Sequence, residues 1–188
     1  YTPIPQDDGA MALPESLTEL LRVPSLRSVY FNYFDFTPAL CQATANALME
    51  GTAITKLDFK QCSFSAEEST VMMANGLSRN ISVSHMKVVM SLDLALFDAL
   101  AALLPSNSTL RHFELRQQPN DDGPDCWPPI FSALGQNTGL KRLNVCGFGS
   151  VDESLCAAMK YGLGLNETLE TLNLDDVPLL DASADLWY

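Results

Sequence analysis

The chain has 188 residues, 47% of them hydrophobic and 18% charged, with a formal net charge of −12. This composition predicts a substantial core, excludes intrinsic disorder and argues against nonspecific nucleic-acid binding. The longest apolar stretch, residues 92–104, contains two aspartates and is too short to span a bilayer. No secretory signal is visible, and five cysteines without C-x-x-C spacing favour reduced thiols. We therefore expect an intracellular, cytoplasmic protein, unless a targeting segment has been removed.

A helix is expected near the N-terminus, over residues 13–21. The sequence LPESLTELL places Leu17, Leu20 and Leu21 on one side of this helix. We expect that side to cover the first of the repeated units that follow, so that residues 1–23 form an N-terminal segment with a capping helix.

A short apolar pattern, L-x-x-L-x-L in its simplest form, then occurs six times. The first residues of successive units are separated by 28, 29, 27, 30 and 29 positions. Such a regular period indicates one supersecondary unit stacked on copies of itself, each covering the apolar face of its neighbour. The units begin at Leu26, Ile54, Val83, Leu110, Leu140 and Leu169.

The unit at residues 54–80 shows how each copy is built. Alternating apolar and polar residues predict a half-buried strand over 56–60. Ser65 and Glu68 have the spacing of a capping box at the start of a helix. We expect Asn80 to end this helix, because asparagine tolerates the left-handed conformation. The expected apolar side of the helix consists of Val71, Met72, Ala74 and Leu77.

The other units repeat these signals. Thr37 and Pro38 are typical of a helix start, and Ser150 with Glu153 forms a second capping box. Gly51 occupies the helix-end position of the first unit. In later units asparagine takes that position, as Asn80, Asn107, Asn137 and Asn166. Three of these asparagines lie in glycosylation sequons, but their place in a turn favours a structural role.

The pattern L-x-x-L-x-L-x-x-C-x-F, followed by a helix and by L-x-x-N-x-[ST]-L, resembles the long leucine-rich repeats of ribonuclease-inhibitor type. The match is best over residues 54–82 and 140–174. This resemblance implies an α/β fold, a right-handed solenoid of about six repeats in a horseshoe arc. Its parallel sheet would line the concave face and its helices the convex face. The solenoid would comprise residues 24–176, with residues 177–188 as a C-terminal tail or partial cap.

The last strand of such a solenoid requires a cover, because an open strand edge invites association. Two alternatives remain open. Either another chain or missing sequence covers this C-terminal edge, or residues 177–188 fold back as a simple cap.

Parallel strands bring equal positions of successive units side by side, about 4.8 Å apart. Over the first five units, the outward strand positions carry five Lys and Arg residues and two carboxylates, a net charge of +3 against −12 for the whole chain. The third positions then form a row of Ser28, Lys56, His85, His112, Arg142 and Thr171. The fifth positions form a row of Tyr30, Asp58, Lys87, Glu114, Asn144 and Asn173, in which Lys87 is neutralised by two flanking carboxylates.

This cationic face favours an acidic or phosphorylated protein partner, with tyrosines as apolar anchors, over a merely solvated sheet face. The expected binding residues are Tyr30, Tyr33, Lys56, Lys60, His85, Lys87, His112, Arg116, Arg142 and Asn144. Among them, the side chains expected to be unpaired are Lys56, Lys60, His85, His112, Arg116 and Arg142.

The sequence does not favour a metal site or a cofactor. His85 and His112 are expected neighbours without a third ligand, and the flanking cations would repel a metal ion. An acidic insertion at residues 117–129 lacks the terminal glutamate of a calcium loop. Within it, Trp127 is either a contact residue or, as we favour, a plug for the gap left by a shortened fourth helix.

The sequence contains no recognisable constellation of nucleophile, base and oxyanion donor. We therefore expect a non-enzymatic protein–protein interaction scaffold or recognition module, a subunit of a larger assembly. One alternative is a regulator that blocks an enzyme, as the resemblance to ribonuclease inhibitor suggests. Another is a GTPase-activating leucine-rich-repeat protein, although no catalytic rim is evident.

Overall fold

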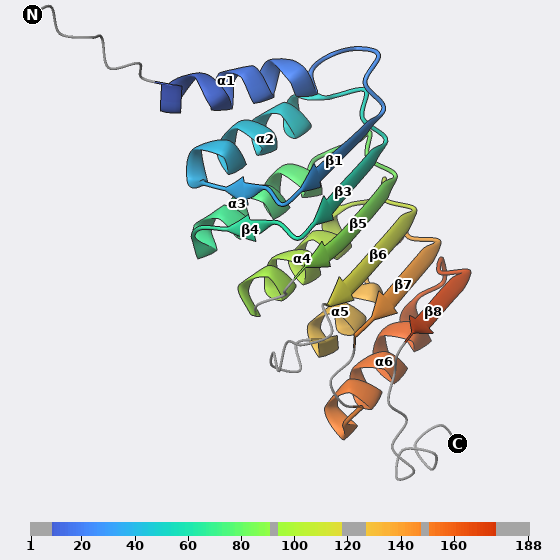
Figure 1. Ribbon diagram of the computed structural model, residues 1–188. Helices are drawn as coiled ribbons and strands as arrows, with labels where there is room; N and C mark the ends of the chain where they lie inside the picture. The colour runs from blue at the N-terminus through green and yellow to red at the C-terminus, as the bar shows by residue number, and fades with distance from the viewer. Residues whose placement is uncertain (1–8, 91–93, 118–126, 148–150, 176–188) are drawn as a thin grey trace, which may run out of the picture.

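The computed structural model describes residues 9–90, 94–117, 127–147 and 151–175, which form a mixed α/β structure (Figure 1). Six strands make one open parallel sheet in the order β1-β3-β5-β6-β7-β8. This order follows the chain, so each strand pairs with the strand of the next repeated unit. The strands are β1 (Ser28–Asn32), β3 (Lys56–Lys60), β5 (His85–Met90), β6 (His112–Gln117), β7 (Arg142–Cys146) and β8 (Thr171–Asp175).

The helices lie together on one face of this sheet, and none of the described segments covers the other face (Figure 1). Each helix contacts the next helix along the chain. The first helix packs against the second at one end of the layer. The helices are α1 (Gly9–Leu21), α2 (Pro38–Glu50), α3 (Glu67–Ser78), α4 (Leu94–Ser106), α5 (Trp127–Leu134) and α6 (Glu153–Leu165). Two short strands, β2 (Asp35–Phe36) and β4 (Ser63–Phe64), pair beside the main sheet.

The core lies between the sheet and the helices. In β3, Leu57 and Phe59 are buried while Lys56 and Lys60 are exposed, which confirms the predicted strand over 56–60. The alternation arises because successive side chains of a strand point to opposite faces. Leucines of β8 are only partly buried, since β8 is the last strand of the described sheet.

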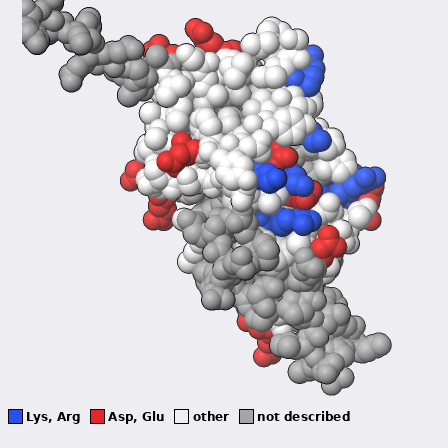
Figure 2. All heavy atoms as spheres, in the orientation of Figure 1, with Lys and Arg blue, Asp and Glu red and all other residues white. Residues whose placement is uncertain are grey.

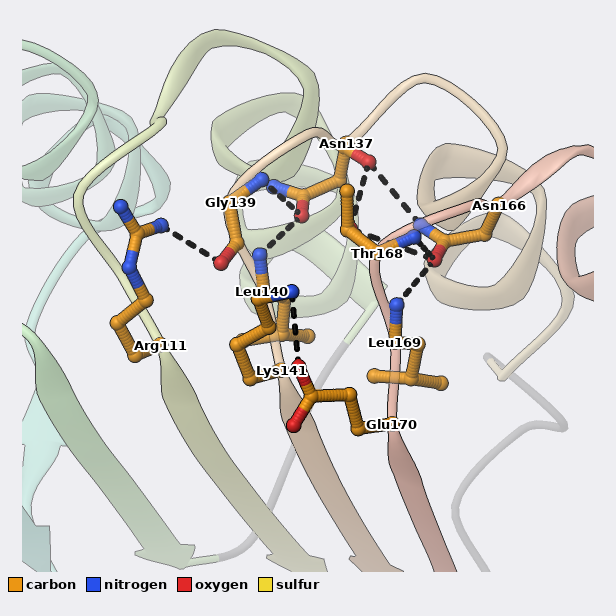
Figure 3. Close-up of polar contacts among 9 residues, drawn as sticks. All are labelled: Arg111, Asn137, Gly139, Leu140, Lys141, Asn166, Thr168, Leu169 and Glu170. Atoms are coloured by element: carbon orange, nitrogen blue, oxygen red, sulfur yellow. Dashed lines mark hydrogen bonds and ion pairs between the residues drawn. The ribbon is translucent and has the colours of Figure 1, made fainter.

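Asparagine side chains join successive units at the helix-to-strand turns (Figure 3). The amide Nδ2 of Asn137 donates to the carbonyl oxygens of Leu104, at 2.6 Å, and Asn107, at 3.2 Å. Its Oδ1 accepts from the backbone N–H groups of Gly139, at 3.1 Å, and Leu140, at 2.7 Å. Equivalent bonds from Nδ2 to the preceding unit are made by Asn80, Asn107 and Asn166.

This role differs from the left-handed conformation expected at these asparagines. Among the described residues other than glycine, positive φ angles occur at Tyr33 and Gln61. Gly51, at 94°, adopts the positive φ expected at the first helix end. Asparagine suits this position because its side-chain amide provides both the donors and the acceptor that the buried backbone groups of the turn require. The hydrogen bonds from Nδ2 of Asn80, Asn107 and Asn166 also support a structural role for the asparagines of the three sequons.

The predicted helix starts are only partly correct. Thr37 caps α2 by accepting from the N–H of Leu40, with Pro38 in the first turn, as expected. The capping box at Ser65 is wrong: α3 is preceded by Ala66, which makes no side-chain capping bond, and Ser65 Oγ donates to the carbonyl of Phe36. Ser150 lies outside the described residues, and the side chain of Asp152 takes the capping role predicted for it by accepting from the N–H of Leu155.

The buried sides of two helices also differ from expectation. Val71 of α3 is 47% exposed, and Met73 is buried in its place. In α1, Leu21 is fully buried and Leu17 packs against the core, whereas Leu20 is exposed. A spacing of three or four residues leaves the direction of a helix face uncertain by about one residue, or about 100° of rotation.

Trp127 fills the core at the start of the short helix α5. Its side chain is 1% exposed and meets the ring of Phe97 edge-on, with 4.8 Å between ring centroids. The plug interpretation is therefore confirmed, and Trp127 is not an exposed contact residue. The acidic part of the insertion, residues 118–126, lies outside the described residues, as does the expected cap at 177–188. Every helix in the described ranges is too short or too polar to cross a membrane.

Candidate functional site

The candidate site is the sheet face that the helices leave uncovered. The strand register places Lys56 beside His85, His85 beside His112, and His112 beside Arg142. With Ser28 and Thr171 at its ends, this third-position row matches the predicted row at every position. The fifth-position row, from Tyr30 to Asn173, is also confirmed. A constant register between parallel strands follows from the nearly constant length of the units.

Two stacked imidazoles occupy the centre of the third-position row. The rings of His85 and His112 are nearly parallel, with an interplanar angle of 16° and centroids 4.2 Å apart. Nδ1 of His85 is 2.9 Å from Oγ of Ser84 and shares a hydrogen bond with it. Nδ1 of His112 is buried and has no hydrogen-bond partner among the described residues.

The surroundings of His112 disfavour its protonated form. Burial, and then the positive potentials of His85 and Arg142, lower the pKa of the His112 imidazole. Near neutral pH the His112 side chain is consequently uncharged. Lys56 and Arg142 place permanent positive charges at either side of the imidazoles.

An ion pair crosses the fifth-position row. Nζ of Lys87 lies 2.7 Å from Oε1 of Glu114, which confirms that Lys87 is neutralised. Arg116 is not unpaired as expected, because its Nε lies 3.9 Å from the same carboxylate oxygen. Arginine is long enough to reach a side chain two residues away on its own strand face.

Asp58 is the other carboxylate of the fifth-position row. Its Oδ1 is buried, and no residue in the described ranges makes a hydrogen bond to it. Burial raises the pKa of the Asp58 carboxyl; Lys87 opposes this shift and Glu114 adds to it. As the pH falls, Asp58 is therefore protonated earlier than an ordinary exposed carboxylate.

The remaining predicted side chains lie around these two rows. Lys60 and Arg116 are exposed in the seventh positions, where Val89 lies between them. Tyr30 and Tyr33 are 55% and 75% exposed at the N-terminal end of the sheet, and Asn144 is partly buried in β7. The structure thus brings all ten predicted residues to the strands or to the turn after β1.

A hollow of about 460 Å³ lies on this face, over β3, β5, β6 and β7. Lys and Arg side chains gather on the strand side of the molecule, with a few carboxylates between them (Figure 2). The hollow is lined by Lys56, Leu57, Asp58, His85, Met86, Lys87, His112, Phe113, Glu114, Arg142 and Asn144. The side chains of Leu57, Met86 and Phe113 are buried in the core on the helix side of the sheet. The side chains of the hollow therefore come from the third and fifth positions, which carry cations, imidazoles and the carboxylates of Asp58 and Glu114.

Two cations that the sequence did not distinguish, Arg111 and Lys141, have structural roles where β6 and β7 begin. Nη1 of Arg111 donates to the carbonyls of Ser108, at 2.8 Å, and Gly139, at 2.6 Å. Lys141 forms an ion pair with Glu170, at 2.9 Å (Figure 3). These cations immediately precede the strands, so their position in the unit is the signal that separates them from the third-position row.

The described residues hold no cluster of three His, Cys, Asp or Glu side chains that suits a metal ion. Cys41, Cys62 and Cys156 are free thiols, and burial raises the pKa of Cys41 to about 11. In comparisons with known proteins, no family model matches the chain and no curated protein sequence is similar to it.

Proposed function

We propose that this protein is a non-enzymatic interaction module that binds an acidic segment of a partner protein on its uncovered sheet face. The observation that carries the proposal is the third-position row, in which Lys56 and Arg142 flank two stacked imidazoles. No carboxylate lies in this row. In the adjacent row, Glu114 pairs with Lys87, and Asp58 lies within the positive potentials of Lys87, Lys56 and Lys60. An anionic ligand therefore meets positive potential along the row.

The proposed architecture is a leucine-rich-repeat solenoid of ribonuclease-inhibitor type. Three features support it: a period of 27 to 30 residues, parallel strands in chain order, and asparagines that bridge successive units. Solenoids of this kind present an extended sheet face, where contacts with a partner chain are spread over several units. Tyr30 and Tyr33 extend this face with exposed aromatic rings, which suit the apolar parts of a partner.

Charge reversal tests which face binds. We expect Lys56→Glu with Arg142→Glu to weaken binding of a fluorescent peptide of alternating Glu and Thr by more than about tenfold, because two attractive pairs become repulsive. The matched control is Arg79→Glu with Lys160→Glu, which changes the net charge equally on the helix side. Fluorescence anisotropy at low salt measures both variants, and a peptide of Gln and Thr gives the uncharged baseline.

Equal loss of affinity in the two double variants would mean that net charge alone attracts the peptide. A loss of affinity confined to the double variant of Arg79 and Lys160 would show that the peptide binds on the helix side. Circular dichroism of each variant checks folding, and all four side chains are exposed, so the substitutions leave the core intact.

A further inference from the structure

We infer that the hollow selects an extended segment with acidic side chains at three alternate positions, lying across β3, β5, β6 and β7. The outer two acidic groups pair with Lys56 and Arg142, and the middle one lies over His85 and His112. This inference rests on the proposed function and specifies the sequence pattern of the partner.

The shape of the hollow gives the direction of the segment. All of its lining residues come from the third to fifth positions of four consecutive strands. It is therefore four strands long but only about three residues wide. An extended ligand that fills it runs across the strands, along the third-position row.

The spacing of the strands gives the spacing of the acidic residues. Lys56 and Arg142 are separated by three strand steps of about 4.8 Å, or about 14 Å. An extended chain rises about 3.4 Å per residue, so side chains four residues apart are also about 14 Å apart and share a face. The side chain between them then lies over the boundary of β5 and β6, where the two imidazoles stack.

The imidazoles suit the middle acidic group. An N–H of either ring can donate to a carboxylate, and a bound carboxylate favours protonation of the pair. The charged groups around the pair are Lys56, Lys87 and Arg142, which attract the ligand, and Asp58 and Glu114, which repel it. Because Lys56 and Arg142 lie in the third-position row and both carboxylates lie in the fifth-position row, an acidic segment is favoured over the third-position row.

The seventh-position cations provide an internal control. Lys60 is on the same strand as Lys56, and Arg116 is on β6, yet neither lines the hollow. Substitution of these two residues removes the same charge from the same sheet face as substitution of Lys56 and Arg142. A difference between the two pairs therefore reports on position within the face.

The experiment uses labelled peptides that contain three glutamates in a Thr background. In one peptide the glutamates alternate with Thr, and in the second they are adjacent; a third has Gln in their place. We expect the alternating peptide to bind about fivefold more tightly than the adjacent one in fluorescence anisotropy at low salt. Lys56→Gln with Arg142→Gln should abolish this preference, and Lys60→Gln with Arg116→Gln should retain it.

The outcomes separate the two proposals. Equal binding of the alternating and adjacent peptides, both tighter than the Gln peptide, would overturn the spacing inference and leave the proposed function standing. Binding of all three peptides with the same affinity would overturn the proposed function itself. The inference would also be overturned if substitution of Lys60 and Arg116 abolished the preference for the alternating peptide while substitution of Lys56 and Arg142 left it intact.

Discussion

Gly162→Ala is expected to destabilise the protein by about 3 kcal/mol, because α5 and α6 meet at this residue without room for a side chain. A Cβ there would collide with the carbonyl oxygen of Phe131 and lie 2.7 Å from its carbonyl carbon. The obstructing atoms belong to the backbone of α5, whose Ile130 and Phe131 side chains are fully buried. The helices therefore have to separate, which exposes part of the core.

Gly164→Ala is the matched control on the same helix. A Cβ at Gly164 meets no atom within 4 Å. Alanine favours a helix over glycine by about 0.5–1 kcal/mol, so this variant should be as stable as the original protein or slightly more so. Thermal unfolding followed by circular dichroism compares them, with an expected fall of about 10 °C for Gly162→Ala. Identical unfolding of the two variants would show that the helices do not approach closely at Gly162.

Asn137→Ala is expected to cost about 3–5 kcal/mol, since its buried amide makes hydrogen bonds to four backbone groups. Alanine leaves two carbonyls and two N–H groups of adjoining units without this partner in a buried turn. Asn137 is 3% exposed, so bulk water does not reach these backbone groups in the folded protein. The loss should therefore fall on the junction between successive units and not on one helix alone.

Asn75→Ala tests whether this loss is specific to the turn. Asn75 is exposed on α3, and its substitution should change the free energy of unfolding by less than about 0.5 kcal/mol. Urea unfolding of both variants provides the comparison. If Asn137→Ala behaves like Asn75→Ala, the amide does not join the units.

The repeat period made the uncovered face predictable in detail. The neighbours of His85 follow from counting equal positions in units of nearly equal length, and the observed pairing agrees with that count. Strand 56–60 was likewise predictable, because alternation of apolar and polar residues is typical of a half-buried strand.

Features that depend on three-dimensional packing were not predictable in the same way. The capping boxes predicted at Ser65 and Ser150 did not give the helix starts, because Ala66 and Asp152 directly precede α3 and α6. The Ser-x-x-Glu spacing alone does not resolve a shift of one or two residues in a helix start. The interaction of Arg116 with Glu114 depends on side-chain reach within one strand. The exposure of Val71 depends on how α3 is rotated against α4, and the local sequence pattern does not determine this rotation.

The two histidines of the chain permit the most direct test of binding on the uncovered face, because both line the hollow. Their imidazole Cε1–H signals can be followed by NMR while the peptide of alternating Glu and Thr is added. Both signals are expected to shift to saturation, and the lowered pKa of His112 should rise in the complex because a nearby carboxylate stabilises the imidazolium. Saturable binding that leaves both histidine signals and the pKa of His112 unchanged would contradict binding in the hollow.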